Sequence, residues 1–141
     1  DDTYPDLHQR AAMANDARAN LFVSIHNNAS GDPASEGTET FYWGTKESCS
    51  PDGQLLAQII QRNLIAALGS LDRGAKTHWY ELVVLAETEM TAALAEVGFM
   101  SNAAEEALLL TAEYQALAAQ AIANGILEYL DWSTQVYSSE S

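Results

Sequence analysis

The stretch LFVSIHNNAS, residues 21–30, starts with a mainly apolar run and ends with a histidine followed by two asparagines. A short apolar run bounded by turn-forming residues is typical of a buried β-strand. The sequence therefore predicts a strand over residues 21–25, with His26 directly after it. In open α/β sheets, functional side chains gather at the carboxyl ends of strands. His26 is for this reason a candidate site residue.

Segments with helical and strand-like periodicity alternate around this strand. The apolar spacing predicts helices over residues 7–19, 51–68 and 113–130, with a short additional helix after Ser101 and Asn102. Further strands are predicted over residues 37–43, 81–85 and 91–99, and DRGAK, residues 72–76, contributes a turn. Residues 133–141 are expected to form a flexible tail. Such alternation predicts an α/β layered domain with a mainly parallel or mixed sheet flanked by helices.

Several helix ends carry recognisable capping residues. Asp6 can accept the first free N–H groups of a helix while Gln9 reaches back to it. Ser50 and Pro51 suit the start of the second long helix, and Gly69 suits its end. These positions predict where two helices start and where the second of them ends, without reference to the rest of the fold.

The composition excludes several classes of protein. The chain has 141 residues, 48% of them hydrophobic, which is enough for one core in a single domain. Its formal charge is −14, and such a surface repels nucleic-acid backbones and anionic membranes. No apolar run approaches the ~20 residues needed to span a bilayer, and no signal peptide is recognised at the start of the chain. We therefore expect no nucleic-acid partner and no membrane span.

Glu96 is the second candidate site residue, because it interrupts the apolar run TAALAEVGF, residues 91–99. A buried carboxylate is costly unless it is paired, protonated or close to a metal ion. Taken alone, Glu96 can instead point to water from an edge strand, and His26 can simply form a hydrogen bond at the end of its strand. Residue types and spacing do not decide between these alternatives.

Five motifs together carry a resemblance to a known family. They are LHQRAAMAN (residues 7–15), LFVSIHNNAS (residues 21–30), GTETFYW (residues 37–43), DRGAK (residues 72–76) and ALAEVGFMSN (residues 93–102). In this order and at these separations they resemble the C-terminal two-thirds of the catalytic domain of zinc-dependent N-acetylmuramoyl-L-alanine amidases. The resemblance covers residues 1–132, and its most specific parts are S-I-H-x-N and E-V-G-F-x-S-N.

The resemblance implies roles for both candidates. His26 matches a zinc ligand of the family, and Glu96 matches its catalytic carboxylate. Arg10, Asn15 and Asn28 match motif positions to which we assign support of the fold. The implied reaction is hydrolysis of the amide between N-acetylmuramic acid and L-alanine by zinc-activated water, with Glu96 as acid and base. The implied substrate is peptidoglycan, both stem peptide and glycan, in the cell envelope, at a periplasmic or extracellular location.

The family's first strands and two further zinc ligands, a histidine and a glutamate, have no match in this chain. A catalytic zinc site normally has three protein ligands, so we expect weak zinc binding and little or no activity from this chain alone. Two interpretations stay open at this point. The chain is either a fragment of an ordinary amidase or a degenerate relative that binds cell-wall peptide or a partner protein without cleaving it. Ligands from a second copy, or from His78, are a third alternative that no spacing supports.

Overall fold

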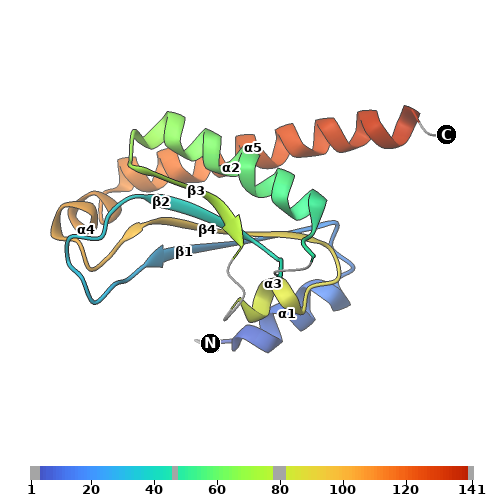
Figure 1. Cartoon of the computed structure of the whole chain (residues 1–141), viewed down its shortest axis with the longest axis horizontal. Helices are drawn as coiled ribbons and strands as arrows, with labels where there is room; N and C mark the ends of the chain where they lie inside the picture. The colour runs from blue at the N-terminus through green and yellow to red at the C-terminus, as the bar shows by residue number, and fades with distance from the viewer. Residues whose placement is uncertain (1–3, 46–47, 78–81, 140–141) are drawn as a thin grey trace.

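The chain folds into a four-stranded mixed sheet that lies between helices (Figure 1), and the computed structural model describes residues 4–45, 48–77 and 82–139. The strands are β1 (Leu21–Asn28), β2 (Thr38–Tyr42), β3 (Asp72–Thr77) and β4 (Thr91–Phe99). The helices are α1 (Leu7–Asp16), α2 (Pro51–Leu68), α3 (Val83–Ala86), α4 (Ala103–Leu109) and α5 (Ala112–Ser139). The predicted fold class, a mixed sheet flanked by helices, is confirmed.

Strand β4 occupies an inner position in the sheet order β1-β4-β2-β3. It pairs with β1 in parallel and with β2 in antiparallel orientation, and β3 pairs in parallel with β2. Ala93, Ala95 and Val97 contribute to one hydrophobic cluster, whereas Ala92 and Leu94 contribute to another. Because β4 is buried on both faces, its sequence is an almost continuous apolar run, as predicted.

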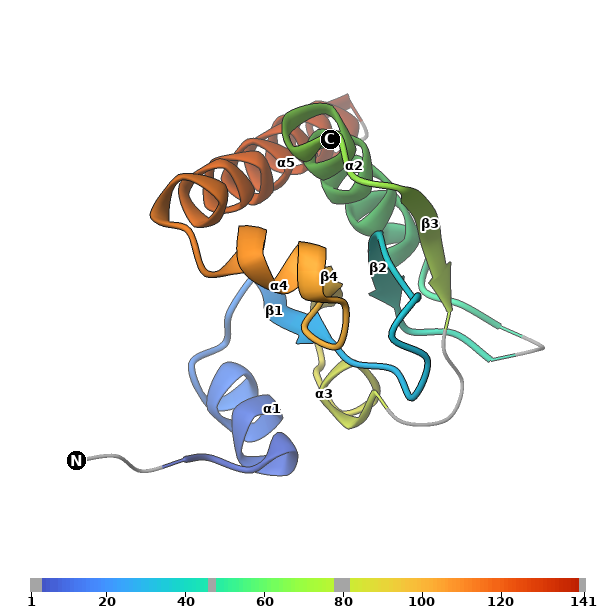
Figure 2. The ribbon, with the colours of Figure 1, turned by 90° about the vertical axis from the view of Figure 1, so that its left-hand side faces the viewer.

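Helices α2 and α5 cover one face of the sheet, on the upper side of Figure 2. Leu56, Ile60 and Leu64 of α2 are fully buried there. The two helices approach closely at Gly125, where a Cβ atom would lie only 3.0 Å from the Cα atom of Ile60. Glycine at this point of α5 therefore permits the tight helix packing above the sheet.

Helices α1 and α3 lie on the opposite face, on the lower side of Figure 2. Val84 and Leu85 of α3 pack with Phe41 and Leu94 of the sheet in the second hydrophobic cluster. This cluster covers only part of the face, so polar side chains occupy the remainder near the end of β4. That remainder contains the candidate site.

The residues predicted to cap helices do so in the structure. Asp6 accepts from the backbone of Gln9 at 2.8 Å while the Gln9 side chain accepts from the backbone of Asp6 at 2.9 Å. Ser50 caps the start of α2, and Gly69 ends it in the left-handed conformation, with φ 63°. Local hydrogen bonding thus determines these helix ends.

Two local predictions are wrong. DRGAK does not form a turn, because α2 returns the chain alongside β2, where residues 72–77 form β3. The left-handed Gly74, with φ 82°, lies where the register between the two strands shifts. The strand predicted over residues 81–85 is also wrong, since Leu85 and Ala86 both donate to the carbonyl of Leu82 and close the helical turn of α3. Glu81 and His78 lie outside the described residues.

Two helices differ from their predicted lengths. Helix α1 ends at Asp16 rather than residue 19, because Arg18 adopts a left-handed conformation with φ 51°. Helix α5 runs through Ser139 and so includes most of the segment expected as a flexible tail. In the part of the chain that the structure describes, no helix combines the length and hydrophobicity needed to cross a membrane.

Truncating the α2 core should destabilise the fold strongly. Leu64 is 0% exposed, so Leu64→Ala is expected to lower the free energy of unfolding by about 2–5 kcal/mol through lost burial and a residual cavity. Urea denaturation followed by circular dichroism measures the change. The matched control is Leu127→Ala on α5, where the side chain is 60% exposed and the expected loss is within about 0.5 kcal/mol. Equal losses in the two variants would contradict the packing described above.

Candidate active site

The two residues singled out from the sequence lie side by side in the sheet. His26 on β1 is the register partner of Glu96 on β4, and Glu96 is in turn the partner of Glu39 on β2. Directly paired residues on neighbouring strands project to the same face, and adjacent strands lie ~4.8 Å apart. Three titratable side chains therefore form a row across the sheet, on the face that α1 and α3 leave partly open.

His26 is half-buried and lies close to the side chain of Ser24. Its Nε2 atom is 2.9 Å from the Ser24 hydroxyl oxygen, two residues earlier on the same face of β1. Burial lowers the pKa of His26, and the positive charge of Arg10 lowers it further. The imidazole is therefore mainly neutral at pH 7, which is the form that can coordinate a metal ion.

Glu96 has the most perturbed environment in the row. Burial raises its pKa to about 7, with a further contribution from the negative charge of Glu39. Its Oε2 atom is buried and has no hydrogen-bond partner among the described residues. A carboxyl group with a pKa close to neutral can both take up and release a proton during a reaction. A buried oxygen without a partner is unusual in a folded protein and marks Glu96 as a candidate functional group.

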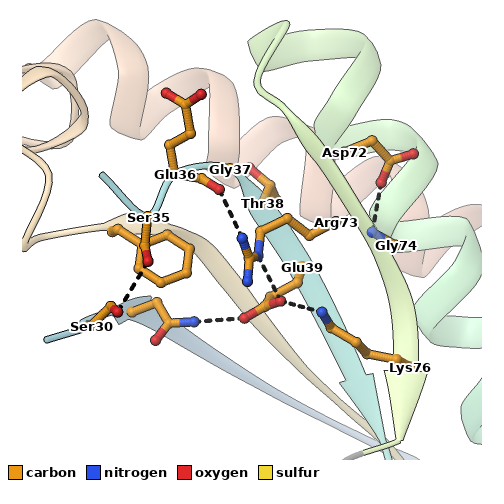
Figure 3. Close-up of polar contacts among 12 residues, drawn as sticks. Ser30, Ser35, Glu36, Gly37, Thr38, Glu39, Asp72, Arg73, Gly74 and Lys76 are labelled. Atoms are coloured by element: carbon orange, nitrogen blue, oxygen red, sulfur yellow. Dashed lines mark hydrogen bonds and ion pairs between the residues drawn. The ribbon is translucent and has the colours of Figure 1, made fainter. Parts of the chain in front are cut away.

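Glu39 is buried and holds a small ionic network, shown in Figure 3. Asn28 donates to its Oε1 at 2.7 Å, while Arg73 donates to Oε2 at 3.0 Å and Lys76 lies 2.5 Å from the same oxygen. Burial alone would raise the pKa of Glu39, but the hydrogen bonds from Lys76 and Arg73 outweigh it, and the pKa is lowered. Glu39 is consequently ionised at neutral pH, unlike much of the Glu96 population.

Aromatic rings hold both cations of this network in place. The guanidinium of Arg73 lies 4.9 Å from the centre of the Phe99 ring, and the ammonium of Lys76 lies 5.7 Å from that of Phe41. Arg73 also donates through Nη1 to the carbonyl of Glu36 at 3.2 Å (Figure 3). These contacts restrict the side-chain freedom of the cations at the site.

A cleft of about 490 Å³ opens over Glu96 and Glu39 of this row, whereas His26 is not among the residues that line it. Its walls come from the ends of β1 and β4, from β2 and β3, and from the loop after β1. The side chains that matter for chemistry are Asn28, Glu39, Arg73, Lys76, Glu96 and Phe99. Because Glu96 lines this cleft, a substrate bound there lies next to the Glu96 side chain.

Helix α4 anchors the rim of the cleft. Asn102 caps this helix, and Glu105 at its third position accepts from the backbone N–H groups of Gly37 at 2.8 Å and Phe99 at 2.7 Å. The backbone of Ser30 also donates to the Ser101 hydroxyl at 3.0 Å. These hydrogen bonds hold the start of β2, the end of β4 and the loop after β1 close to the start of α4.

Of the residues predicted to support the fold, Asn15 and Asn28 make tertiary contacts, whereas Arg10 makes a local one. Asn15 binds the carbonyl of Glu87 at 2.8 Å and the N–H of Glu89 at 3.0 Å, which fixes α1 against the approach to β4. Arg10 donates to the carbonyl of Pro5 at 3.0 Å. His8, by contrast, is exposed and contacts Glu87 at 2.9 Å, away from the cleft.

Sequence reasoning missed Glu39, Arg73 and Lys76. A signal existed in TETFY, because strand alternation places Glu39 and Phe41 on one face and the two threonines on the other. A charged residue on the same face as a large aromatic one requires a partner when that face is buried. DRGAK supplies that partner, but reading it as a turn concealed the pairing of β3 with β2.

Metal binding needs donors beyond those in the cleft. Across residues 4–45, 48–77 and 82–139, no three side chains of His, Cys, Asp or Glu come together in a group that could hold a metal ion. The row provides one imidazole and one uncommitted carboxylate, since the Glu39 carboxylate already binds two cations.

Comparison with known proteins identifies relatives over most of the chain. The model of one family, described as N-acetylmuramoyl-L-alanine amidase, matches residues 1–128. The protein YqiI of Bacillus subtilis is 40% identical over 131 residues, covering 93% of this chain and 61% of that protein. The N-acetylmuramoyl-L-alanine amidase LytC of the same organism is 38% identical over 128 residues, covering 91% of this chain and 25% of LytC. The chain thus spans less than two-thirds of the length of these relatives.

Solved structures share the fold. The catalytic domain of the amidase CwlV from Paenibacillus polymyxa superposes with a TM-score of 0.83 at 44% identity, covering 93% of this chain and 69% of that domain. An N-acetylmuramoyl-L-alanine amidase from Clostridium difficile gives a TM-score of 0.84 at 37% identity, with coverage of 93% and 68%.

The ionic network should make stability depend on pH. Because the folded state lowers the pKa of Glu39 below the ordinary 4.5, the unfolded chain binds its proton more readily. The contribution of this carboxylate is therefore complete well above that pH and disappears as pH falls through the folded-state pKa. We expect Glu39→Gln to cost about 1–3 kcal/mol at pH 7 and less on acidification, measured by urea denaturation at several pH values.

The control for this experiment is Glu128→Gln, which removes the same charge from an exposed pair with Arg62. Its effect at pH 7 should be smaller than that of Glu39→Gln. A Glu39→Gln variant as stable as the wild type at pH 7, or a difference that grows in acid, would show that the network does not stabilise the fold.

Proposed function

Because the chain belongs to the N-acetylmuramoyl-L-alanine amidase family, we propose that it forms the larger part of a catalytic domain that hydrolyses peptidoglycan. The bond cleaved is the amide between N-acetylmuramic acid and the L-alanine of the stem peptide. One observation supports this most: Glu96, whose buried Oε2 has no hydrogen-bond partner among the described residues, lines the cleft and is the register partner of His26. The choice of substrate is supported by LytC and by the germination-specific amidase of Bacillus subtilis, two relatives that are N-acetylmuramoyl-L-alanine amidases.

Glu96 is the proposed acid and base of this reaction. Its free oxygen takes a proton from the attacking water, whose oxygen bonds to the carbonyl carbon of the lactyl group. The C–N bond then breaks, and Glu96 returns the proton to the leaving amine of L-alanine. A pKa of about 7 suits both transfers, because the group is neither too weak a base nor too weak an acid at neutral pH.

His26 is the proposed contribution of this chain to a zinc site. Its neutral imidazole suits coordination, but a catalytic zinc ion normally has three protein ligands, and the described residues do not bring three together. These residues alone therefore do not fit a zinc ion, and the proposal needs a further histidine and glutamate from outside the described part of the chain. The incomplete donor set also favours a second candidate function, the binding of cell-wall peptide or a partner protein without cleavage.

The proposed setting is the cell envelope, at a periplasmic or extracellular location where peptidoglycan is accessible. The proposed partners are the glycan and stem peptide of that polymer. With a formal charge of −14, the chain gains no long-range attraction to anionic wall polymers. Recruitment to the wall would have to come from specific contacts in the cleft or from another domain.

Replacing Glu96 tests its chemical role. In a chimera in which this chain replaces the matching part of a related amidase domain, Glu96→Gln should lower kcat by about 10²–10⁴-fold, because the amide cannot accept the proton of water. Release of stem peptide from purified peptidoglycan measures turnover, and atomic absorption shows whether zinc remains bound. The matched control is Glu106→Gln on the exposed side of α4. Undiminished turnover in the Glu96 variant would exclude the proposed role.

Zinc binding separates the two candidate functions. The 141-residue chain should retain less than one equivalent of zinc after dialysis and release no stem peptide, since one imidazole and one carboxylate hold the ion weakly. Tight binding of one equivalent that His26→Ala abolishes would show that the chain itself provides a complete ligand set. The chimera should bind zinc tightly and cleave, and a chimera that binds substrate without cleaving it would support the second function.

A further inference from the structure

The cleft concentrates positive charge on a strongly acidic chain. The sequence has six Lys and Arg residues against 20 Asp and Glu, yet Arg73 and Lys76 both line this one cleft. Their side chains are 35% and 40% exposed, whereas the carboxylate that they share on Glu39 is 6% exposed. The anionic partner thus lies at the base of the cleft, and the two cations remain accessible from its opening.

Neutralising Glu39 does not require both cations. Its Oε1 atom already accepts from Asn28, and Arg73 and Lys76 both contact the single remaining oxygen, Oε2. Two positive charges against the Glu39 carboxylate leave a surplus of one positive charge in the network, which the neighbouring Glu96 does not cancel while it is protonated. Arg73 uses Nε and Nη1, and its Nη2 makes no hydrogen bond to the described residues. A donor and a net charge are therefore available for an anionic ligand.

We propose that Arg73 and Lys76 form a subsite that binds the free carboxylate of the second residue of the stem peptide. This inference rests on the function proposed above, because it takes the scissile bond to be the one between the lactyl group and L-alanine. The subsite would select for a charged group on the peptide side of that bond.

The distance from Glu96 to the two cations matches the distance from the scissile bond to the second residue of the stem peptide. Both cationic groups contact the carboxylate of Glu39, which is the register partner of Glu96 on the next strand. Neighbouring strands lie ~4.8 Å apart, and an extended peptide advances by ~3.5 Å per residue. An anionic group one or two residues from the scissile bond can therefore reach the cations while Glu96 faces the reacting amide.

The chemistry of the substrate leaves one carboxylate in this range. The lactyl carboxyl group of muramic acid is consumed in the scissile amide, and the carboxyl group of L-alanine is consumed in the next peptide bond. Where the second residue is D-glutamate joined through its γ-carboxyl group, its α-carboxylate stays free. The glycan side of the bond thus offers no carboxylate, and the peptide side offers one at the second residue.

Direct binding tests the subsite with two ligands that differ in this group alone. They are N-acetylmuramyl-L-alanyl-γ-D-glutamyl-L-lysine with a free glutamate α-carboxylate and the same compound with an α-carboxamide. Calorimetric titration of the 141-residue chain should show about 10-fold tighter binding of the carboxylate form, as expected for charge-assisted hydrogen bonds. Arg73→Gln and Lys76→Met should each reduce this preference substantially.

Two further variants keep the experiment decisive. Arg62→Gln removes the same charge from an exposed pair with Glu128 and should keep the full preference. If Arg73→Gln does not fold, because Glu39 loses a partner, the double variant Glu39→Gln with Arg73→Gln removes both members of the pair and should show the same loss. Folding of each variant is checked by thermal unfolding.

The outcomes separate the subsite from the proposed function. A carboxylate preference that the cleft variants reduce, and that Arg62→Gln keeps, supports the subsite. Equal binding of both ligands, or a preference unchanged in the cleft variants, overturns the subsite while leaving the chain a muropeptide binder. Binding of neither ligand overturns the subsite and also contradicts peptidoglycan as the substrate. A role for the cations in stability alone predicts no preference for either ligand.

Discussion

The pairing of β4 with strands on both sides is the constraint on which the rest of the structure depends. This pairing aligns His26, Glu96 and Glu39 in one row, because register partners project to the same face. It also places Ala93, Ala95 and Val97 under α2 and α5. A shift of one residue would turn Glu96 into the hydrophobic cluster and expose apolar side chains in the cleft. Burial of the core and alignment of the site therefore both require the same register of β4 with its neighbours.

Two carboxylates in this row have opposite protonation tendencies, although both are largely removed from water. Glu39 accepts from Asn28, Arg73 and Lys76, so its ionised form is stabilised. Burial favours the neutral form of Glu96, and the negative charge of Glu39 on the neighbouring strand favours it further. Burial acts on both groups in the same direction, so the difference comes from the cations that contact Glu39.

Local signals in the sequence predicted a large part of the fold. Capping at Asp6, Ser50 and Gly69 and the apolar run of β4 depend on neighbouring residues, and the structure matches them. The strand at DRGAK and the helical turn at Val83–Ala86 depend instead on what packs against them, which periodicity does not reveal. The same limit applies to the site. His26 and Glu96 were recognisable from their motifs, whereas the ion pairs of Glu39 became visible only with the pairing of β2 and β3.

The long separation of β1 from β4 has a consequence for folding. Leu21 pairs with Thr91, so the chain between them, including α2 and the strands β2 and β3, must be brought together before this ladder forms. Closing so large a loop carries an entropic cost that contacts near in sequence avoid, and such topologies fold slowly. His26 and Glu96 meet only when this ladder forms. Partly folded molecules, even with α2 and α5 in place, would therefore lack the paired groups of the candidate site.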